Sequence, residues 1–421
     1  MTARNITVLD QVTIWSPELT EPREGAAVVI EDGRIADVID AGTGPTDAAT
    51  IAAGGRWLLP GFIDSHAHLW GSRSANHVHW VTDPRKLASF RAVGDLGRIL
   101  DAGFTTVREA GGPIGPALRD AVSQGEIRGP RVVPAYLGIS RTGGHGDCHS
   151  LPIEWVKEQP YMAMIADGAD EVRKAVRTVA REGGEWVKIW ASGAIALSDN
   201  DSPEHLHFAP DELEAICAEA HAVGMKVGAH VEFPAAIRAC LEAGVDVVEH
   251  GFVLDRETAE LMASKNVALV ATMALLHRYL RHDGEGITPA QVAMARELLP
   301  TVHESAKLAW DSGVRIALGS DSFAEPLTPY GRNAEELLAL REAGVSAQGC
   351  LEALTINGAH VVGREAELGS IEIGKVADLV LAGHRSPLED LTAIVGAENL
   401  ALVLAAGRPV AGTALKTGVE L

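Results

Sequence analysis

The middle of the chain repeats one pattern, in which a short apolar run is followed by a segment with helical spacing. The apolar runs lie near residues 57–66, 104–110, 131–138, 186–192, 226–232, 247–252, 267–273 and 314–321. The helical segments between them include Asp211–Val223, Pro234–Ala243, Asp255–Ser264 and Ala290–Asp311. Strands that alternate with helices build a parallel sheet, and eight such units close into a barrel. The pattern therefore predicts an α/β protein in which residues 59–364 form a (β/α)8 TIM barrel.

Glycines mark the ends of several helical segments. Gly224, Gly244 and Gly313 each stand where a helix needs a left-handed residue to end. The rival arrangement is a doubly wound open sheet, which carries a glycine-rich phosphate loop after its first strand. Because no such loop follows the first apolar run, the sequence favours the barrel.

Both ends of the chain have the character of β-structure. Strand-like runs occur at 26–30, 34–39, 377–381 and 400–405. Asp32-Gly33, between the first two runs, is a strong hairpin-turn signal. We predict that residues 1–58 and 365–421 pair into a small composite β-sandwich domain beside the barrel.

Charge and composition exclude several classes of partner. The formal net charge is −21, which disfavours nucleic acid and anionic membranes as partners. The chain has no apolar run of about 18 residues, the length of a membrane-spanning helix. Its four cysteines form no CxxC pair, and the first residues lack the apolar core of a secretory signal. We expect a cytoplasmic protein that acts on a small molecule.

Residues of the kinds that bind metals come at the ends of five expected strands. His66 and His68 are two positions apart, and a strand projects such residues from one face. Barrel active sites are built at the carboxyl ends of the strands. The complete set is His66, His68, Lys188, His230, His250 and Asp321. Each alone could be structural, and Asp321 could simply cap a helix, but their joint occurrence predicts a metal site.

Lys188 is unusual because it lies inside the apolar run Trp186–Trp190. Lysine is almost never buried without a partner, and burial lowers its pKa and leaves a nucleophilic amine. Such an amine suits either a Schiff base or the capture of carbon dioxide as a carbamate, which is anionic and can bridge two cations.

With these residues in place, the chain resembles the amidohydrolase superfamily, in its binuclear class with a carbamylated lysine. Within that class it is similar to imidazolonepropionases, Xaa-Pro dipeptidases and related amide hydrolases. The similarity spans nearly the whole length. It rests on the segments 59–64, 141–147, 187–193, 248–251, 319–321 and 355–359.

The resemblance implies a role for each matched residue. His66, His68 and Asp321 would hold one metal, His230 and His250 the other, and a carbamate on Lys188 would bridge both together with a hydroxide. Two cations lower the pKa of a shared water and polarise a carbonyl. Asp321, beside that hydroxide, would act as general base and then as general acid. Zinc suits these ligands, although manganese and cobalt stay open.

Other residues are candidates for the substrate pocket. His145, in a glycine-rich loop, would donate to the carbonyl or tetrahedral oxygens. His149 and Met273 are weaker candidates for substrate contact. Dipeptidase-like relatives often have a tyrosine two positions after the strand-five histidine, where this chain has Glu232. An anion there would repel a substrate carboxylate, unless Glu232 turns away to a neighbouring cation.

We therefore expect a metal-dependent amidohydrolase that cleaves an amide-type bond in an amide, carbamate, urea or peptide-like substrate. The alternatives are an Xaa-Pro-type dipeptidase and a cyclic amidohydrolase that opens a lactam or imide ring. A mononuclear deaminase would need a glutamate where this chain has Phe233, and a non-catalytic scaffold would have lost ligands. Relatives often assemble into rings, so we also expect a homo-oligomer.

Overall fold

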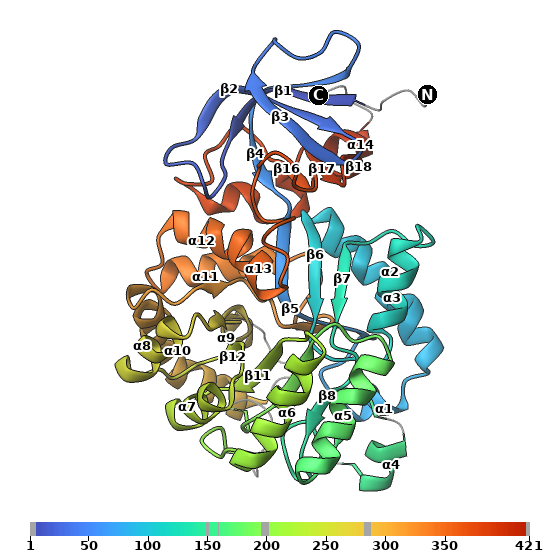
Figure 1. Ribbon diagram of the computed structural model, residues 1–421, viewed down its shortest axis with the longest axis vertical. Helices are drawn as coiled ribbons and strands as arrows, with labels where there is room; N and C mark the ends of the chain where they lie inside the picture. Colours follow the sequence, from blue (N-terminus) through green and yellow to red (C-terminus); the bar gives the residue numbers. More distant parts are fainter. Residues whose placement is uncertain (1–5, 149–150, 159, 195–201, 282–287, 418–421) are drawn as a thin grey trace.

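The computed structural model describes residues 6–148, 151–158, 160–194, 202–281 and 288–417. Figure 1 shows a β-sheet at one end of the molecule and a larger body below it, in which helices surround parallel strands. Strand β4 runs from the first part into the second, where β5 continues it.

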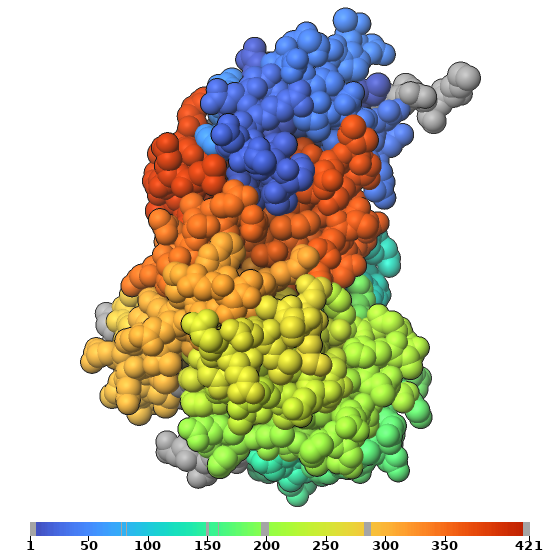
Figure 2. Space-filling view, turned by 60° about the vertical axis from the view of Figure 1, so that its left-hand side comes forward, coloured from blue at the N-terminus to red at the C-terminus, as the bar shows by residue number. Residues whose placement is uncertain are grey.

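Strands from both ends of the chain form one seven-stranded sheet, in the order β18-β17-β16-β4-β1-β2-β3. These strands are β1 (Ile6–Ile14), β2 (Arg23–Glu31), β3 (Arg34–Asp40), β4 (Ala49–Pro60), β16 (Leu379–Leu381), β17 (Leu402–Ala405) and β18 (Arg408–Ala411). Asp32 and Gly33 have φ angles of 50° and 81° and join β2 to β3, as predicted. Leu9 and Leu404, from opposite wings of the sheet, share one apolar cluster. Figure 2 shows the N-terminal surface in blue directly against the C-terminal surface in orange and red.

The larger body contains two parallel sheets, ordered β14-β13-β12-β11-β10-β8-β9 and β15-β5-β6-β7. Their strands are β5 (Phe62–Ser72), β6 (Phe104–Glu109), β7 (Arg131–Pro134), β8 (Gly138–Ser140), β9 (Ala163–Ile165), β10 (Val187–Trp190), β11 (Val227–Val231), β12 (Val247–His250), β13 (Ala268–Val270), β14 (Ile316–Ala317) and β15 (Ser322–Ala324). All of their pairings are parallel. The prediction of an α/β fold is confirmed.

Backbone hydrogen bonds also run between the two parallel sheets. Ser65 N–H donates to the Leu318 carbonyl over 2.8 Å, just beyond β14. On the opposite side, Glu185 N–H donates to the Pro134 carbonyl over 2.7 Å, at the end of β7. The sheets are therefore linked at two places, where β5 approaches the end of β14 and where the start of β10 approaches the end of β7.

Helices separate most of the parallel strands and end where glycines were expected to end them. They are α1 (His77–Thr82), α2 (Arg85–Asp101), α3 (Gly115–Ser123), α4 (Ile153–Glu158), α5 (Ala169–Arg181), α6 (Pro210–Ala222), α7 (Pro234–Ala243), α8 (Arg256–Ser264), α9 (Ala274–Arg281), α10 (Pro289–Asp311), α11 (Glu336–Glu342), α12 (Ala347–Leu354), α13 (Ile356–Val361) and α14 (Thr413–Thr417). Gly224, Gly244 and Gly313 have φ angles of 75°, 100° and 79°, as left-handed helix ends require. Within the described ranges, no helix combines the length and apolarity needed to cross a membrane.

The expected strands are mostly longer than the observed ones, and in three of them the difference changes which residues belong to a strand near the site. The run 57–66 divides at Gly61, whose Cα packs so tightly against Thr105 and Asp378 that no Cβ would fit. Its first part belongs to β4, which therefore extends past residue 58 to Pro60. The run 131–138 divides into β7 and β8. The run 314–321 contains only the short β14, so Asp321 lies in the turn before β15 and not at a strand end.

Candidate active site

The alternation of side chains along β5 brings one row of residues into the site. Every second residue projects from the same face of the strand, and this row consists of Asp64, His66, His68 and Trp70. On β10, Lys188 and Trp190 do likewise, and on β11 His230 is followed by Glu232 two residues later. These strands lie inside the body, so the projecting side chains meet at its centre.

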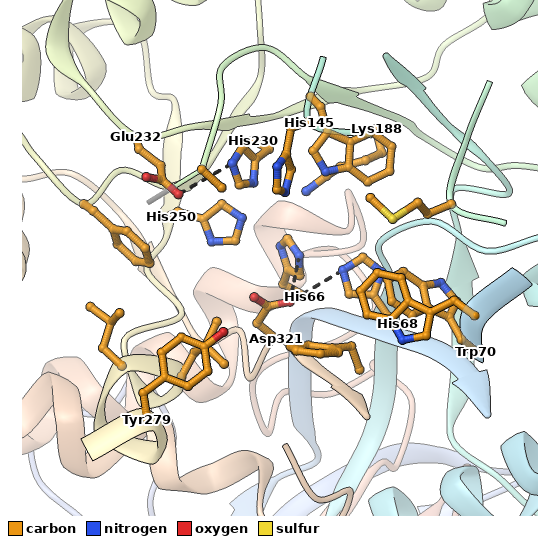
Figure 3. Close-up of a pocket in the computed structure, with 18 residues that line it drawn as sticks. His66, His68, Trp70, His145, Lys188, His230, Glu232, His250, Tyr279 and Asp321 are labelled. Carbon is orange, nitrogen blue, oxygen red and sulfur yellow. Dashed lines mark ion pairs between the residues drawn. The ribbon is translucent and has the colours of Figure 1, made fainter. Parts of the chain in front are cut away.

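The side chains meet in a pocket, drawn in Figure 3. All six predicted ligand residues line it, together with His145 and Glu232. The other lining residues are Trp70, Trp80, Met162, Trp190, Ala194, Phe252, Leu275, Leu276, Tyr279 and Phe323. The pocket thus combines a polar cluster of histidines with mostly apolar walls.

His66, His68 and Asp321 can share one metal ion. Their ligand atoms all lie within 4.8 Å of one another. Asp321 Oδ1 is 3.5 Å from Nε2 of both histidines. Each histidine uses its other nitrogen elsewhere: His66 Nδ1 donates to Glu249 Oε2 over 2.7 Å, and His68 Nδ1 to the Gly111 carbonyl over 3.3 Å. Both Nε2 atoms are left as acceptors, the form that binds a metal.

His230 and His250 form the second half of the cluster. Their ring centroids are 4.4 Å apart, and the His250 ring is 5.1 Å from that of His66. His250 Nδ1 lies 2.7 Å from Thr272 Oγ1, which leaves its Nε2 for the pocket. His230 Nε2 is buried and has no hydrogen-bond partner among the described residues. Burial lowers the pKa of both imidazoles far below the usual value, which keeps them neutral and able to bind a cation.

Lys188 lies among these histidines and is 1% exposed. Its Nζ makes no hydrogen bond or ion pair with another described residue, and the Trp190 ring centroid is 5.7 Å away. Burial lowers the pKa of Lys188 to about 8, although the charges of Glu249 and Asp321 oppose this shift. Burial also raises the pKa of Asp321 to about 6, and Lys188 is the first of the charges that oppose it. A buried amine without a hydrogen-bond or ion-pair partner is costly, which indicates a functional role.

A buried ion pair holds His66 in place. Arg108 Nη1 donates to Glu249 Oε1 over 2.6 Å, while the other Glu249 oxygen accepts from His66. The Arg108 guanidinium stacks 3.3 Å above the Trp186 ring centroid. Gly228 supplies the space, because a Cβ there would lie 2.5 Å from Arg108 Nη2. Sequence reasoning missed Glu249, although a carboxylate in the apolar run 247–250 was a visible signal.

Strained backbone turns two ligands into the site. His250 follows Glu249 directly, so an extended strand would point the two side chains to opposite faces. His250 instead has a φ of 73°, and its hydrogen-bond partner Thr272 has a φ of 52°. Asp321 has a φ of 45°. Left-handed backbone at such residues costs energy and concentrates at functional sites.

Some of the remaining candidates from the sequence lie at the pocket, and others do not. His145 stacks on His230, with ring centroids 4.7 Å apart. Glu232 Oε1 lies 3.6 Å from His230 Nε2, so Glu232 faces the cluster. Met273 packs in the core and is not among the residues that line the pocket, and His149 lies outside the described residues. His207 is buried and accepts a hydrogen bond from His145 N–H.

Comparisons with known proteins agree with this geometry. The model of the amidohydrolase family matches residues 57–410. The chain belongs to the amidohydrolase family. This amidohydrolase is 33% identical over 392 residues to ochratoxinase of Aspergillus niger, covering 88% of this chain and 80% of that protein. It is 26% identical over 394 residues to imidazolonepropionase of Porphyromonas gingivalis, covering 86% and 84%.

A solved structure supports the same assignment. A prolidase complexed with N-methylphosphonate-L-proline has a TM-score of 0.89 and 32% identity, over 96% of this chain and 99% of its own. The family and its relatives make this protein a metal-dependent hydrolase of amide-type carbon–nitrogen bonds. The predicted superfamily and enzyme class are confirmed.

Proposed function

We propose that the site holds two divalent cations, one bound by His66, His68 and Asp321 and the other by His230 and His250. The observation that supports this most directly is the convergence of four neutral imidazoles on an unpartnered buried lysine. Ions bound there would polarise an amide carbonyl and lower the pKa of a water molecule. Zinc suits imidazole and carboxylate ligands, and manganese or cobalt would also be accepted.

We propose further that Lys188 carries a carbamate. The ammonium would first lose one proton, and the neutral amine would then attack dissolved carbon dioxide, form an N–C bond as one C=O π bond opens, and release a second proton. Together these two losses turn a buried cation into an anion. That change of sign relieves the cost of an unpaired ammonium between histidines. It also provides two oxygen ligands at the point where both halves of the cluster meet.

In the proposed reaction, water adds to the carbonyl carbon and the C–N bond breaks, which yields an amine and a carboxylic acid that loses its proton to solvent. Asp321 accepts the proton of the attacking water and returns it to the leaving nitrogen. Burial raises the pKa of Asp321 to about 6 in the site without metal, which makes this carboxylate a stronger proton acceptor than an exposed aspartate. His145, stacked on His230, donates to the oxygens of the tetrahedral stage.

The substrate is proposed to be a small amide, carbamate, urea or peptide-like molecule with apolar groups. Trp70, Trp80 and Phe323 form one apolar wall, with ring centroids of the two tryptophans 4.8 Å apart. Glu232 in the pocket disfavours a substrate carboxylate beside His230. The prolidase and imidazolonepropionase relatives keep an Xaa-Pro dipeptidase or a cyclic amidohydrolase as the alternative.

The test combines metal analysis with a substrate panel. Protein produced with added zinc should contain about two equivalents of metal and lose activity on chelation. The panel consists of N-acyl amino acids, their amides, dipeptides, lactams, carbamates and phenylureas. We expect amides to be cleaved faster than the matching free acids. Protein without transition metal would contradict the proposed centre, and preference for the free acid would contradict the role of Glu232.

The proposal extends to the architecture and setting of the enzyme. We propose that the two linked parallel sheets form one closed (β/α)8 barrel over residues 59–364, and that residues 1–58 and 365–421 form a β-sandwich domain. We also propose a homo-oligomer without nucleic-acid or membrane partners, which light scattering would test. The four cysteines are free and buried, which supports a reducing, cytoplasmic setting.

A further inference from the structure

Tyr279 is a pocket residue that no pattern in the sequence singles out. It belongs to α9, the helix that follows β13, and is 2% exposed. Its ring lines the pocket, and Figure 3 shows the hydroxyl pointing toward Asp321 and the centre of the cluster. The hydroxyl makes no hydrogen bond with another described residue. A donor that reaches the pocket is therefore left for a bound molecule.

The position of Tyr279 relative to Asp321 is held by its neighbours. Glu336 of α11 accepts hydrogen bonds from Met273 N and Ala274 N, over 2.9 and 2.6 Å, at the start of α9. Arg278, which precedes Tyr279, is buried and donates to the Ser320 carbonyl over 3.5 Å. Ser320 in turn precedes Asp321, so α9 is tied directly to the turn that carries this carboxylate. Such support keeps a donor in place before the substrate arrives.

The carboxylates near the Tyr279 hydroxyl indicate which part of the pocket this hydroxyl faces. Burial raises the pKa of Tyr279, and the negative charges of Asp321 and Glu232 raise it further. These two carboxylates flank different halves of the cluster, since Asp321 lies 3.5 Å from His66 Nε2 and Glu232 lies 3.6 Å from His230 Nε2. The hydroxyl thus stays protonated and faces the space between the halves, where a reacting carbonyl must lie.

We propose that Tyr279 is a catalytic residue, whose hydroxyl donates a hydrogen bond to the scissile carbonyl oxygen as that oxygen gains negative charge. The inference rests on the proposed amide hydrolysis and adds a second donor to His145. The phenol keeps its proton throughout: the new C–O bond comes from water, the C–N bond breaks, and the amine leaves with the proton that Asp321 returns. The interaction is strongest at the tetrahedral stage, so it lowers the barrier more than it tightens substrate binding.

The test is Tyr279→Phe, which removes only the hydroxyl. We expect kcat to fall by about 100-fold to 1000-fold, as for other lost oxyanion donors, with KM changed less than about threefold. Metal content should equal that of the wild type. The affinity for a tetrahedral phosphonate analogue of the best substrate should fall by a factor similar to that in kcat, while the affinity for the carboxylate product stays constant.

The matched control is Tyr136→Phe, which removes the hydroxyl of a partly exposed tyrosine outside the pocket. It should leave kcat and analogue affinity unchanged. A Tyr279→Phe enzyme with wild-type kcat, or with raised KM alone, would overturn the inference, as would undiminished affinity for the phosphonate. These outcomes are distinct from a failure of the proposed amide hydrolysis. In that case the wild-type protein itself would bind no metal and cleave no member of the substrate panel.

Discussion

At the scale of a residue, substitution of Lys188 is the most direct test of the proposed two-metal centre. Lys188→Ala should abolish activity and reduce the bound metal, because the variant lacks the proposed bridging anion. Formate or acetate, which can enter the vacated space as a carboxylate, should restore part of both. The measurements are hydrolysis rate and metal content with and without the added acid.

The control for Lys188 is Lys226, a partly buried lysine whose Nζ donates to the His360 carbonyl over 2.6 Å, outside the pocket. Lys226→Ala should keep its metal and show no activation by acetate. A fully active Lys188→Ala enzyme would rule out the bridging role.

The pKa of Lys188 makes carbamate formation dependent on pH. Only the neutral amine attacks carbon dioxide, and burial lowers the pKa from 10.5 to about 8, which increases the neutral fraction at neutral pH. At constant dissolved carbon dioxide, metal-free enzyme should therefore regain activity faster as pH rises toward 8, and the rate should level off above it. Reactivation with zinc, followed between pH 6 and about 9, measures this. A rate independent of carbon dioxide would contradict carbamylation.

At the scale of an element, β11 depends on the absence of a side chain at Gly228. A Cβ there would lie 2.5 Å from Arg108 Nη2 and 2.6 Å from Glu249 Oε1. Gly228→Ala should destabilise the protein by about 1–3 kcal/mol, as overpacking does. It should also weaken metal binding, since Glu249 orients His66. Denaturant unfolding and chelator competition measure the two effects.

The matched substitution is Gly94→Ala in the middle of α2, where the nearest atom, Arg98 Nη1, is 4.0 Å from the added Cβ. Alanine is the better helix former, so this variant should be about 0.5–1 kcal/mol more stable and bind metal normally. If both variants had the same free energy of unfolding and the same metal affinity, the Arg108–Glu249 pair would tolerate displacement.

Strand alternation explains how much of the site could be predicted from sequence. It places His66 with His68 without any knowledge of the fold, and βα repetition brings Lys188 and His230 beside them. The direction of Tyr279 depends instead on how α9 packs against α11, which local spacing does not encode. The division at Gly61 was also hidden, because it arises from close contact with Thr105 and Asp378.

At the scale of the whole molecule, the terminal sheet and the larger body with the parallel sheets are joined at several points. Gly61 alone separates β4 from β5, and its N–H donates to the Asp378 carbonyl over 2.7 Å. Arg131 of β7 forms a 2.8 Å ion pair with Asp378. Val380 and Val403 of the sheet belong to the same apolar core as the parallel strands. Contacts of this kind couple the unfolding of two regions.

Leu404→Ala tests this coupling at a distance from the active site. Leu404 is 1% exposed in the core of the terminal sheet, so its truncation should cost about 2–5 kcal/mol. We expect activity and circular dichroism to be lost in a single transition, both shifted to lower denaturant by the same amount, because the sheet cannot open without exposing β5. At low denaturant kcat should stay at the wild-type value. Activity that survives after part of the β-signal is lost would show that the terminal sheet unfolds by itself.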